Sequence, residues 1–297
     1  MEPSFKFKRE IKKVLPGVKE GVLLKNWTTF RIGGKANYFF EAKNKRELIK
    51  AIEVAKKYKI PFFILGGGSN VLVADEGFEG MVIKYGESLS LYVFKGLDWA
   101  AGIPGTIEGA VYGNASAFSH SMEEVVKEVE VYDTKRKKIK IFKNKDCKFG
   151  YRESIFKKNK SLIILSVRIR TKKSNLQKIK EYLEYRKNHH PQLPSIGCIF
   201  KNFQFKITEF RKLIKKFPQM RQFEKKGEIP TAFLIAGCGL KGKRIREVQI
   251  SEKHPNFIVN LGKGKAKDVR ELISLAKKKV KERYGIEIKE EIQYLGF

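Results

Sequence analysis

A run of three glycines, a serine and an asparagine separates two short apolar segments of this chain. It consists of Gly66, Gly67, Gly68, Ser69 and Asn70. The flanking segments, 61–65 and 71–74, have the length and residue types of strands. A Rossmann loop opens a helix and a P-loop needs Gly-Lys-Ser/Thr before one, so a turn between strands argues against both folds. Residues without Cβ can point successive N–H groups at an anion, so the turn predicts a pyrophosphate site, with an ordinary hairpin turn as the alternative.

A second stretch of small residues, 101–117, indicates a close approach to a flat ligand. Its glycines and alanines stand where a packed helix or strand would usually carry larger side chains. Around the two stretches, Asn44 can cap a helix that ends at 58–61, and alternating apolar residues predict strands at 125–132 and 163–169.

The pattern changes near Ser174, which predicts a domain boundary. A helix with one apolar face starts there and ends at Pro191 and Pro194. A second domain then begins near Ser195. It ends with a helix stopped by Gly285 and a final strand expected at 286–295.

Charge and composition limit the class of protein. The chain has 63 Lys and Arg against 32 Asp and Glu, a net charge of +31. An excess of this size can mark a nucleic-acid binder, but here the basic residues are spread over every segment rather than gathered in one arm with interleaved aromatics. We expect no dedicated nucleic-acid partner, although the charge would attract phosphate-bearing ligands.

Neither a membrane segment nor a metal site is expected. No stretch approaches the ~18 consecutive apolar residues of a membrane span, and residues 1–13 lack the apolar core of a signal peptide. The protein is therefore expected in the cytosol. Its three cysteines are far apart, with no Cys-x-x-Cys pair and only four histidines, so we expect free thiols and no metal.

Six motifs occur in the order and with the spacing of one enzyme family. They are 29–34 (TFRIGG), 65–72 (LGGGSNVL), 102–106 (GIPGT), 151–154 (YRES), 197–202 (GCIFKN), and 251–254 (SEKH) with Asn256 and Phe257. Each motif alone is weak evidence. Together they resemble the UDP-N-acetylenolpyruvoylglucosamine reductase (MurB) family over nearly the whole chain.

This resemblance implies a fold and the boundaries of its domains. It implies an FAD-binding domain of the vanillyl-alcohol-oxidase (PCMH) type in two α+β subdomains, followed by an α+β substrate domain. The expected segments are an N-terminal extension at 1–25, an FAD domain at 26–172 with subdomains of about 26–86 and 87–172, a connecting helix at 173–194, and a substrate domain at 195–297.

The resemblance also implies the reaction. NADPH would deliver hydride to FAD, and the reduced flavin would pass it to UDP-N-acetylglucosamine enolpyruvate, giving UDP-N-acetylmuramate for peptidoglycan. With no His beside the glycine turn, the flavin would be bound non-covalently, and the family suggests a monomer. The implied FAD contacts are Gly66, Gly67, Gly68, Ser69, Asn70, Gly102, Ile103, Pro104, Gly105, Thr106, Gly109 and Asn114.

Three residues match the family's catalytic positions. Arg152 would stabilise a carboxylate that becomes an enolate, and Glu291 would act as an acid or orient the enolate, for which burial should raise its pKa. Cys198 replaces the usual proton-donating serine, and a thiol can supply a proton over the same reach. The implied substrate ligands are Tyr151, Lys201 and Asn202. Without the motifs, a surface ion pair, a solvated glutamate and a buried thiol would be the ordinary interpretations of the three catalytic positions.

Two further departures from the family bear on the cofactor. Only residues 85–95 connect two segments between which relatives typically carry a strand and a helix, so the second subdomain should be shortened. Glu108 replaces a usual glycine and is expected near the flavin, where its carboxylate could repel the phosphates. Two alternatives to the reductase therefore stay open: an FAD-linked oxidoreductase of the same superfamily with another substrate, and a degenerate, non-catalytic homologue.

Overall fold

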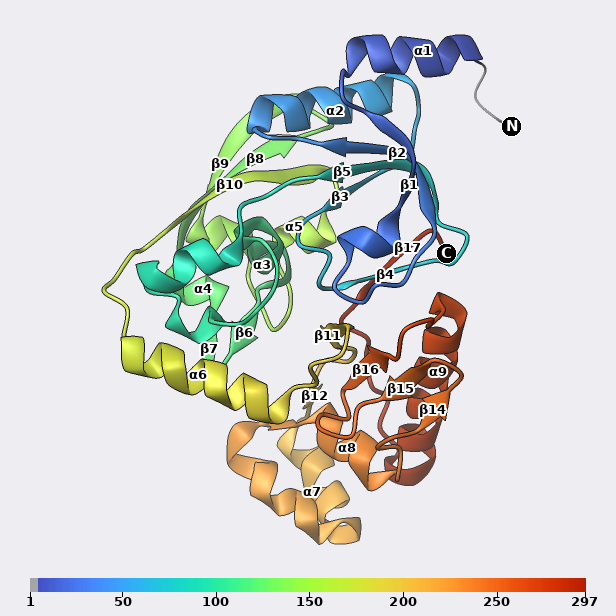
Figure 1. Cartoon of the computed structure of the whole chain (residues 1–297). Helices are drawn as coiled ribbons and strands as arrows, with labels where there is room; N and C mark the ends of the chain where they lie inside the picture. The colour runs from blue at the N-terminus through green and yellow to red at the C-terminus, as the bar shows by residue number, and fades with distance from the viewer. Residues whose placement is uncertain (1–4) are drawn as a thin grey trace.

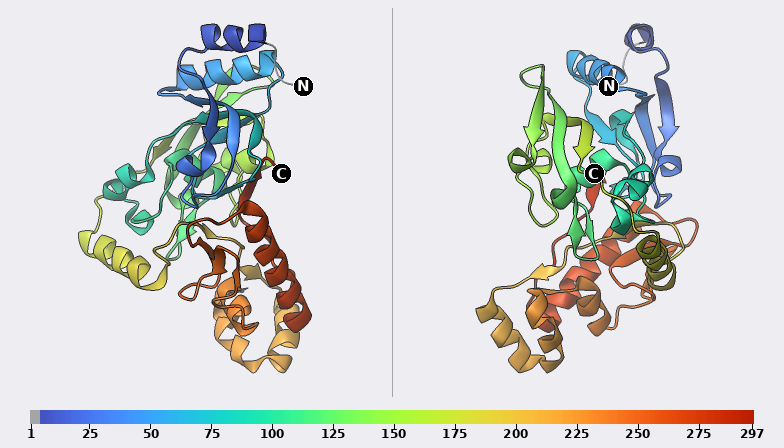
Figure 2. Two further views of the ribbon diagram at one scale, coloured as in Figure 1. Left: turned by 45° about the vertical axis from the view of Figure 1, so that its right-hand side comes forward. Right: turned by 90° about the vertical axis from the view of Figure 1, so that its left-hand side faces the viewer.

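The chain folds into three parts, each built on its own sheet. The computed structural model describes the backbone from residue 5 and the side chains from residue 10, both to residue 297. Figure 1 shows the first two parts above the third, and the right-hand view of Figure 2 shows the first two sheets side by side. Helices and strands mix in every part, so the predicted α+β class is confirmed.

The first part is a four-stranded sheet of order β1-β2-β5-β3 with helix α2 packed on it. Asn44 caps α2 as predicted, its Oδ1 accepting the N–H of Glu47 at 3.0 Å. The glycine turn lies between β3 and β4, between strands as the sequence indicates. The elements are α1 (Phe5–Val14), β1 (Lys19–Leu23), the 3-10 helix η1 (Leu24–Trp27), β2 (Lys35–Glu41), α2 (Lys45–Lys57), β3 (Phe62–Leu65), β4 (Val71–Val73) and β5 (Phe78–Lys84).

The segment 1–25, expected as an N-terminal extension, contributes to this sheet. Strand β1 pairs antiparallel with β2, with Lys19 opposite Phe39 and Leu23 opposite Lys35. Residues 1–4 of the segment lie outside the described residues. The sheet therefore begins earlier in the chain than position 26.

The second part packs a three-stranded sheet of order β10-β8-β9 against α3. Between β5 and η3 the chain forms only the 3-10 helix η2, which is the short connection that residues 85–95 predict. The elements are η2 (Leu89–Lys95), η3 (Asp98–Ala100), α3 (Ile107–Gly113), β6 (Ser116–Ala117), β7 (His120–Ser121), α4 (Met122–Val125), β8 (Val126–Asp133), β9 (Lys138–Lys143), η4 (Asn144–Cys147), α5 (Ile155–Lys158) and β10 (Leu162–Ile169).

The third part follows α6 (Leu176–His189), the helix predicted to start near Ser174. Its sheet has the order β11-β16-β15-β14 and packs on the long helix α9, which ends at Gly285 with φ +70. The elements are β11 (Ser195–Cys198), β12 (Phe203–Gln204), α7 (Ile207–Lys216), the 3-10 helix η5 (Pro218–Lys226), β13 (Glu228–Ile229), α8 (Thr231–Gly237), β14 (Arg244–Ile245), β15 (Val248–Ile250), β16 (Phe257–Asn260), α9 (Ala266–Tyr284) and β17 (Gln293–Leu295).

The last strand is shorter than expected and belongs to a different sheet. Only Gln293–Leu295 forms a ladder, and its partner is β4, which directly follows the glycine turn. The preceding residues are extended but pair with residues 199–201 through an isolated bridge and single hydrogen bonds, so the strand predicted at 286–295 was too long. Figure 1 shows the C-terminus returning to the first part of the molecule.

A buried asparagine ties the third part to the first. Asn260 is 2% exposed, and its Nδ2 donates to Phe30 O at 3.1 Å, inside the 29–34 motif. Its Oδ1 accepts the N–H groups of Gly262 and Gly264, both at 2.9 Å. One side chain therefore binds a buried carbonyl of the first part and two backbone N–H groups of the third.

Replacing Asn260 by Ala should lower the free energy of unfolding by about 2–4 kcal/mol, because the buried Phe30 carbonyl and the N–H groups of Gly262 and Gly264 would lose their partner. Chemical denaturation at neutral pH measures this change. Asn188→Ala, at an exposed position of α6, is the matched control. An unfolding midpoint of Asn260→Ala equal to that of the control would contradict this role.

Candidate active site

The two glycine-rich stretches lie directly against each other. A Cβ on Gly67 would come within 2.4 Å of Gly105 Cα. Gly68 has a φ of +65, and a Cβ there would stand 2.1 Å from the carbonyl oxygen of Trp27. Only residues without a side chain allow this approach of the two backbones.

The glycine turn offers free hydrogen-bond donors. Among the described residues, no protein acceptor takes the backbone N–H groups of residues 66–69. Ser69 Oγ lies beside the second stretch, 3.1 Å from where a Cβ of Gly105 would stand. Successive unpaired N–H groups bind anions, so these residues fit the pyrophosphate of FAD.

The other predicted cofactor residues surround the start of α3. Thr106 caps this helix, and its Oγ1 accepts the N–H of Gly109 at 3.1 Å. Gly102 lies against the side of α6, and Ile103 packs into the core of the second part. Pro104 is exposed. Contacts with α6 and with the core of the second part thus hold the second stretch next to the glycine turn.

Asn114 holds the loop that precedes the catalytic motif. It ends α3 with a φ of +44, and its Nδ2 donates to Gly150 O at 2.9 Å. Its Oδ1 accepts the N–H of Glu123 at 3.0 Å. Because protein groups occupy both ends of this amide, the predicted contact with FAD stays a prediction.

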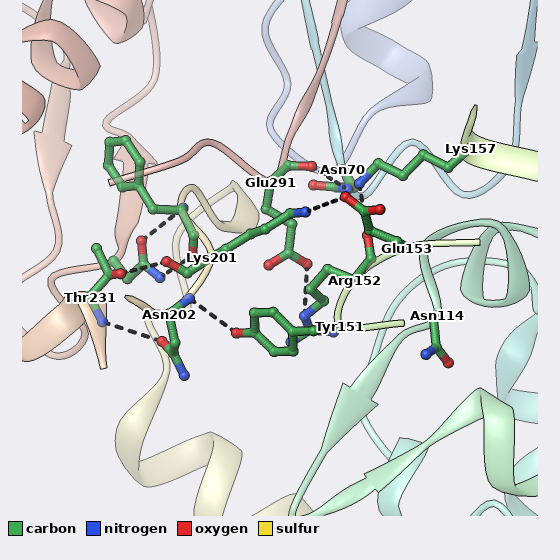
Figure 3. Close-up of polar contacts among 12 residues, drawn as sticks. Asn70, Asn114, Tyr151, Arg152, Glu153, Lys157, Lys201, Asn202, Thr231 and Glu291 are labelled. Carbon is green, nitrogen blue, oxygen red and sulfur yellow. Dashed lines mark hydrogen bonds and ion pairs between the residues drawn. The ribbon is translucent and has the colours of Figure 1, made fainter. Parts of the chain in front are cut away.

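Arg152 stands in a tight turn. Gly150 and Glu153 exchange two backbone hydrogen bonds, of 3.1 and 3.0 Å. Arg152 between them has a φ of +57, a left-handed conformation that costs a residue with a Cβ about 1–2 kcal/mol. The surrounding contacts hold this conformation, and it directs the guanidinium toward the third part of the molecule (Figure 3).

Arg152 and Glu291 form a mostly buried ion pair. Nε lies 3.2 Å from Glu291 Oε1, with 21% and 16% of the two side chains exposed. The Arg152 Nε–H has no acceptor with hydrogen-bond geometry in the described protein, which leaves it able to turn to a ligand oxygen. Burial raises the pKa of Glu291, and the charges of Arg152, Lys157 and Lys201 oppose this rise. Glu291 can therefore hold or share a proton, as the sequence predicts.

The backbone brings Cys198 to the same place. Cys198 ends β11, and the carbonyl of the next residue, Ile199, accepts the N–H of Glu291 at 2.8 Å. Burial, together with the Glu291 charge, raises the pKa of the Cys198 thiol to about 12. At neutral pH the thiol keeps its proton, as a proton donor must.

The three predicted substrate residues lie together beside this pair. The backbone N–H of Asn202 donates to the Tyr151 hydroxyl at 3.0 Å, and Asn202 Nδ2 donates to Glu228 Oε1 at 2.8 Å. Lys201 Nζ lies 3.3 Å from Glu153 Oε1. Tyr151 comes from the second part and the other two from the third, so the site spans the junction.

Glu108 packs against residues 86 and 87 of the short connection. Its Oε2 accepts the N–H of Glu87 at 3.0 Å and fills the space beside Gly86, where a Cβ would come within 2.4 Å of it. Burial raises the pKa of Glu108 to about 7. The carboxyl group therefore braces the short connection between the first two parts.

Two polar side chains of the site were missed by the sequence analysis. Lys157 Nζ donates to Arg152 O at 3.1 Å. Asn256 accepts from Phe200 N–H at 3.0 Å and donates to Phe200 O at 2.8 Å, and so fixes the segment after Cys198. Asn256 lies in the sixth motif, which was a usable signal. Lys157 is one of 63 basic residues, and nothing in the sequence distinguishes it.

Other kinds of site find no support in the part of the chain that the structure describes. No three His, Cys, Asp or Glu side chains gather there as ligands for a metal ion. None of its helices combines the length and apolar character needed to cross a bilayer. The three cysteines are free thiols, as predicted.

Comparison with known proteins identifies the chain. Residues 36–93 match an FAD binding domain, so fold and site together define a flavin-dependent oxidoreductase. Residues 189–295 match the C-terminal domain of UDP-N-acetylenolpyruvoylglucosamine reductase. The chain belongs to the UDP-N-acetylenolpyruvoylglucosamine reductase family.

Relatives of this name match nearly end to end. The reductase of Caldicellulosiruptor bescii is 36% identical, covering 92% of this chain and 89% of its own. That of Solibacter usitatus is 33% identical, covering 91% and 94%. The crystal structure of the reductase (MurB) from Thermus caldophilus superposes with a TM-score of 0.73 at 30% identity, covering 93% of this chain and 98% of that one.

The raised pKa of Glu108 predicts a pH-dependent stability. The carboxyl is protonated in the folded protein up to about pH 7 but in the unfolded chain only up to about pH 4.5, so its contribution is complete below pH 4.5 and is lost as the pH rises to 7. Glu108→Gln should therefore be more stable than the wild type at pH 8, by about 2–3 kcal/mol, and similar at pH 4.5.

Denaturation curves of Glu108→Gln at both pH values test this, with Glu184→Gln on the exposed face of α6 as the control. A stability difference from wild type that is the same at pH 4.5 and pH 8 would show that Glu108 is charged in the folded protein.

Proposed function

We propose that this protein reduces UDP-N-acetylglucosamine enolpyruvate to UDP-N-acetylmuramate in peptidoglycan synthesis, with non-covalently bound FAD and with NADPH as the reductant. The observation that carries the proposal is the meeting of Arg152, Glu291 and Cys198 at one junction, beside the glycine turn with its free N–H groups. FAD would supply the hydride transfer from the nicotinamide to the enolpyruvyl methylene carbon.

Arg152 is assigned to the substrate carboxylate. Addition of hydride to the methylene carbon places negative charge on the neighbouring carbon and on its carboxylate. A guanidinium offers a planar pair of donors to such an enolate, and the Nε–H of Arg152 has no well-directed protein acceptor. Because the side chain is mostly buried, its charge acts on the substrate with little screening by water.

Cys198 and Glu291 are assigned to the proton. The high pKa of Cys198 keeps a proton on the thiol until the carbanion, a much stronger base, develops beside it. Glu291, itself mostly buried, can orient the enolate by a shared proton. Tyr151, Lys201 and Asn202, on the open side of the pair, are assigned to the uridine diphosphate.

The proposed reaction also suggests a cellular compartment and an oligomeric state. Both a nucleotide-linked substrate and NADPH belong to the cytosol, where we place the enzyme, acting as a monomer. The positive charge of the chain would favour the approach of both anionic ligands.

The visible absorption spectrum tests the proposed reaction. The purified protein should show the two-band flavin spectrum, which bleaches on anaerobic addition of NADPH and returns on addition of the enolpyruvyl nucleotide-sugar. Return of the bands without that substrate would indicate a flavoenzyme of another specificity. A colourless protein that takes up no added FAD would overturn the proposal.

Cys198→Ala should separate the two half-reactions. Bleaching by NADPH should keep its rate, whereas reoxidation by the substrate should slow by about 10²–10⁴-fold, the usual contribution of a positioned acid. Cys198→Ser should recover much of the rate because its hydroxyl also carries a proton. Stopped-flow absorbance measures both steps, and full-rate reoxidation of Cys198→Ala would rule out the thiol as the donor.

A further inference from the structure

Lys157 is a lysine without a carboxylate partner at the centre of the site. It lies on α5, and Figure 3 shows its side chain extending toward Asn70 and Glu153. Within the described residues no carboxylate lies within ion-pair distance of its Nζ. Its hydrogen bond goes instead to the backbone carbonyl of Arg152, at 3.1 Å. A lysine near a carboxylate cluster would ordinarily pair with one, so this contact needs a reason.

The local backbone holds Lys157 in register with Arg152. Ser154, fully buried, caps α5 by accepting the N–H of Lys157 at 3.2 Å, and its Oγ donates to Tyr112 O at 2.7 Å. The cap fixes α5 to α3 and sets the helix one turn beyond Arg152. Lys157 can therefore reach back to the Arg152 carbonyl with little loss of side-chain freedom during the reaction.

A hydrogen bond to the Arg152 carbonyl can stabilise the backbone conformation of Arg152. Arg152 has a left-handed φ of +57, and relaxation of this conformation would rotate the peptide and swing the guanidinium away from Glu291. A charged donor on the carbonyl opposes that rotation, because hydrogen bonds from charged groups are stronger than neutral ones.

Lys157 also adds charge to the site. The Glu291 carboxylate is faced by Arg152, Lys157 and Lys201, and Cys198 lies on its other side. Lys157 is in turn faced by Lys201, Lys160, Glu153 and Glu291. Glu153 is already paired with Lys158, at 3.0 Å, and with Lys201. Among the described residues Glu291 has one ion-pair partner, Arg152, against two for Glu153, so the Lys157 charge has its larger effect on Glu291.

We propose that Lys157 is a positioning residue of the reduction: its ammonium group fixes the Arg152 carbonyl, and it adds positive charge beside the Glu291 carboxylate. Its role is exerted through Arg152 and Glu291. The inference rests on the proposed function and extends it to a residue that the sequence does not single out.

Three substitutions separate the two parts of this role. Lys157→Met removes donor and charge, Lys157→Gln keeps a neutral donor, and Lys157→Arg keeps both. The control is Lys145→Met, an exposed lysine of the same subdomain. Flavin absorbance and the unfolding midpoint of each holoenzyme establish that FAD and fold are retained.

Lys157→Met should lower kcat by about ten- to hundredfold, the effect of losing one charged hydrogen bond, while the KM for NADPH stays unchanged. Removal of a positive charge makes ionisation of Glu291 harder, so the Glu291 limb of the kcat–pH profile should move to higher pH. Lys157→Gln should show the same pH displacement with a smaller loss of kcat. Lys157→Arg and Lys145→Met should keep the wild-type profile.

The inference is overturned if Lys157→Met turns over with the wild-type kcat and pH profile. If Lys157→Met loses FAD, the kcat–pH profiles of Lys157→Gln and Lys157→Arg are compared instead. Identical profiles for these two variants would overturn the inference. Failure of the proposed function would differ, because the wild type itself would then oxidise no NADPH in response to the enolpyruvyl substrate, and both proposals would fall together.

Discussion

The parallel pairing of β17 with β4 is the contact on which the site depends. It joins the end of the chain to the strand that leaves the glycine turn, with Gln293 opposite Val71. The residues just before β17 are thereby drawn across the junction, where Glu291 meets both Arg152 and the segment after Cys198. No part of the molecule contains the site alone: the donors for an anion, the guanidinium, and the thiol with its carboxylate come from three different parts.

The electrostatics of the site follow from this burial at a junction. A mostly buried carboxylate and guanidinium are stable only as a pair, and removal of either leaves an uncompensated charge. The surrounding lysines keep the balance positive, which suits a substrate that brings its own carboxylate and diphosphate. Glu108 shows the opposite solution to the same problem. Among the described residues Glu108 makes no ion pair, and burial raises its pKa to about 7.

The features that could be predicted from the sequence are those that depend on residues close together in the chain. The cap at Asn44, the strands flanking the glycine turn and the helix stop at Gly285 depend on neighbouring residues, and each is present as predicted. The last strand was predicted too long, because alternating apolar residues at 286–292 are buried without a continuous partner strand. The direction of the Glu108 side chain and the contact of Lys157 with Arg152 depend on the tertiary arrangement, for which the sequence carries no local signal.

The pairing of the C-terminal strand β17 with β4 has a consequence for synthesis and folding. Strand β4 can gain its partner only after residues 293–295 have left the ribosome, whereas β1, β2, β3 and β5 can pair much earlier. Contacts between distant segments form slowly, because the chain loses conformational entropy in closing a long loop before the contacts stabilise it. The first sheet can therefore form while β4 is still unpaired, and the glycine turn gains its flanking strand pair only once residues 293–295 are available.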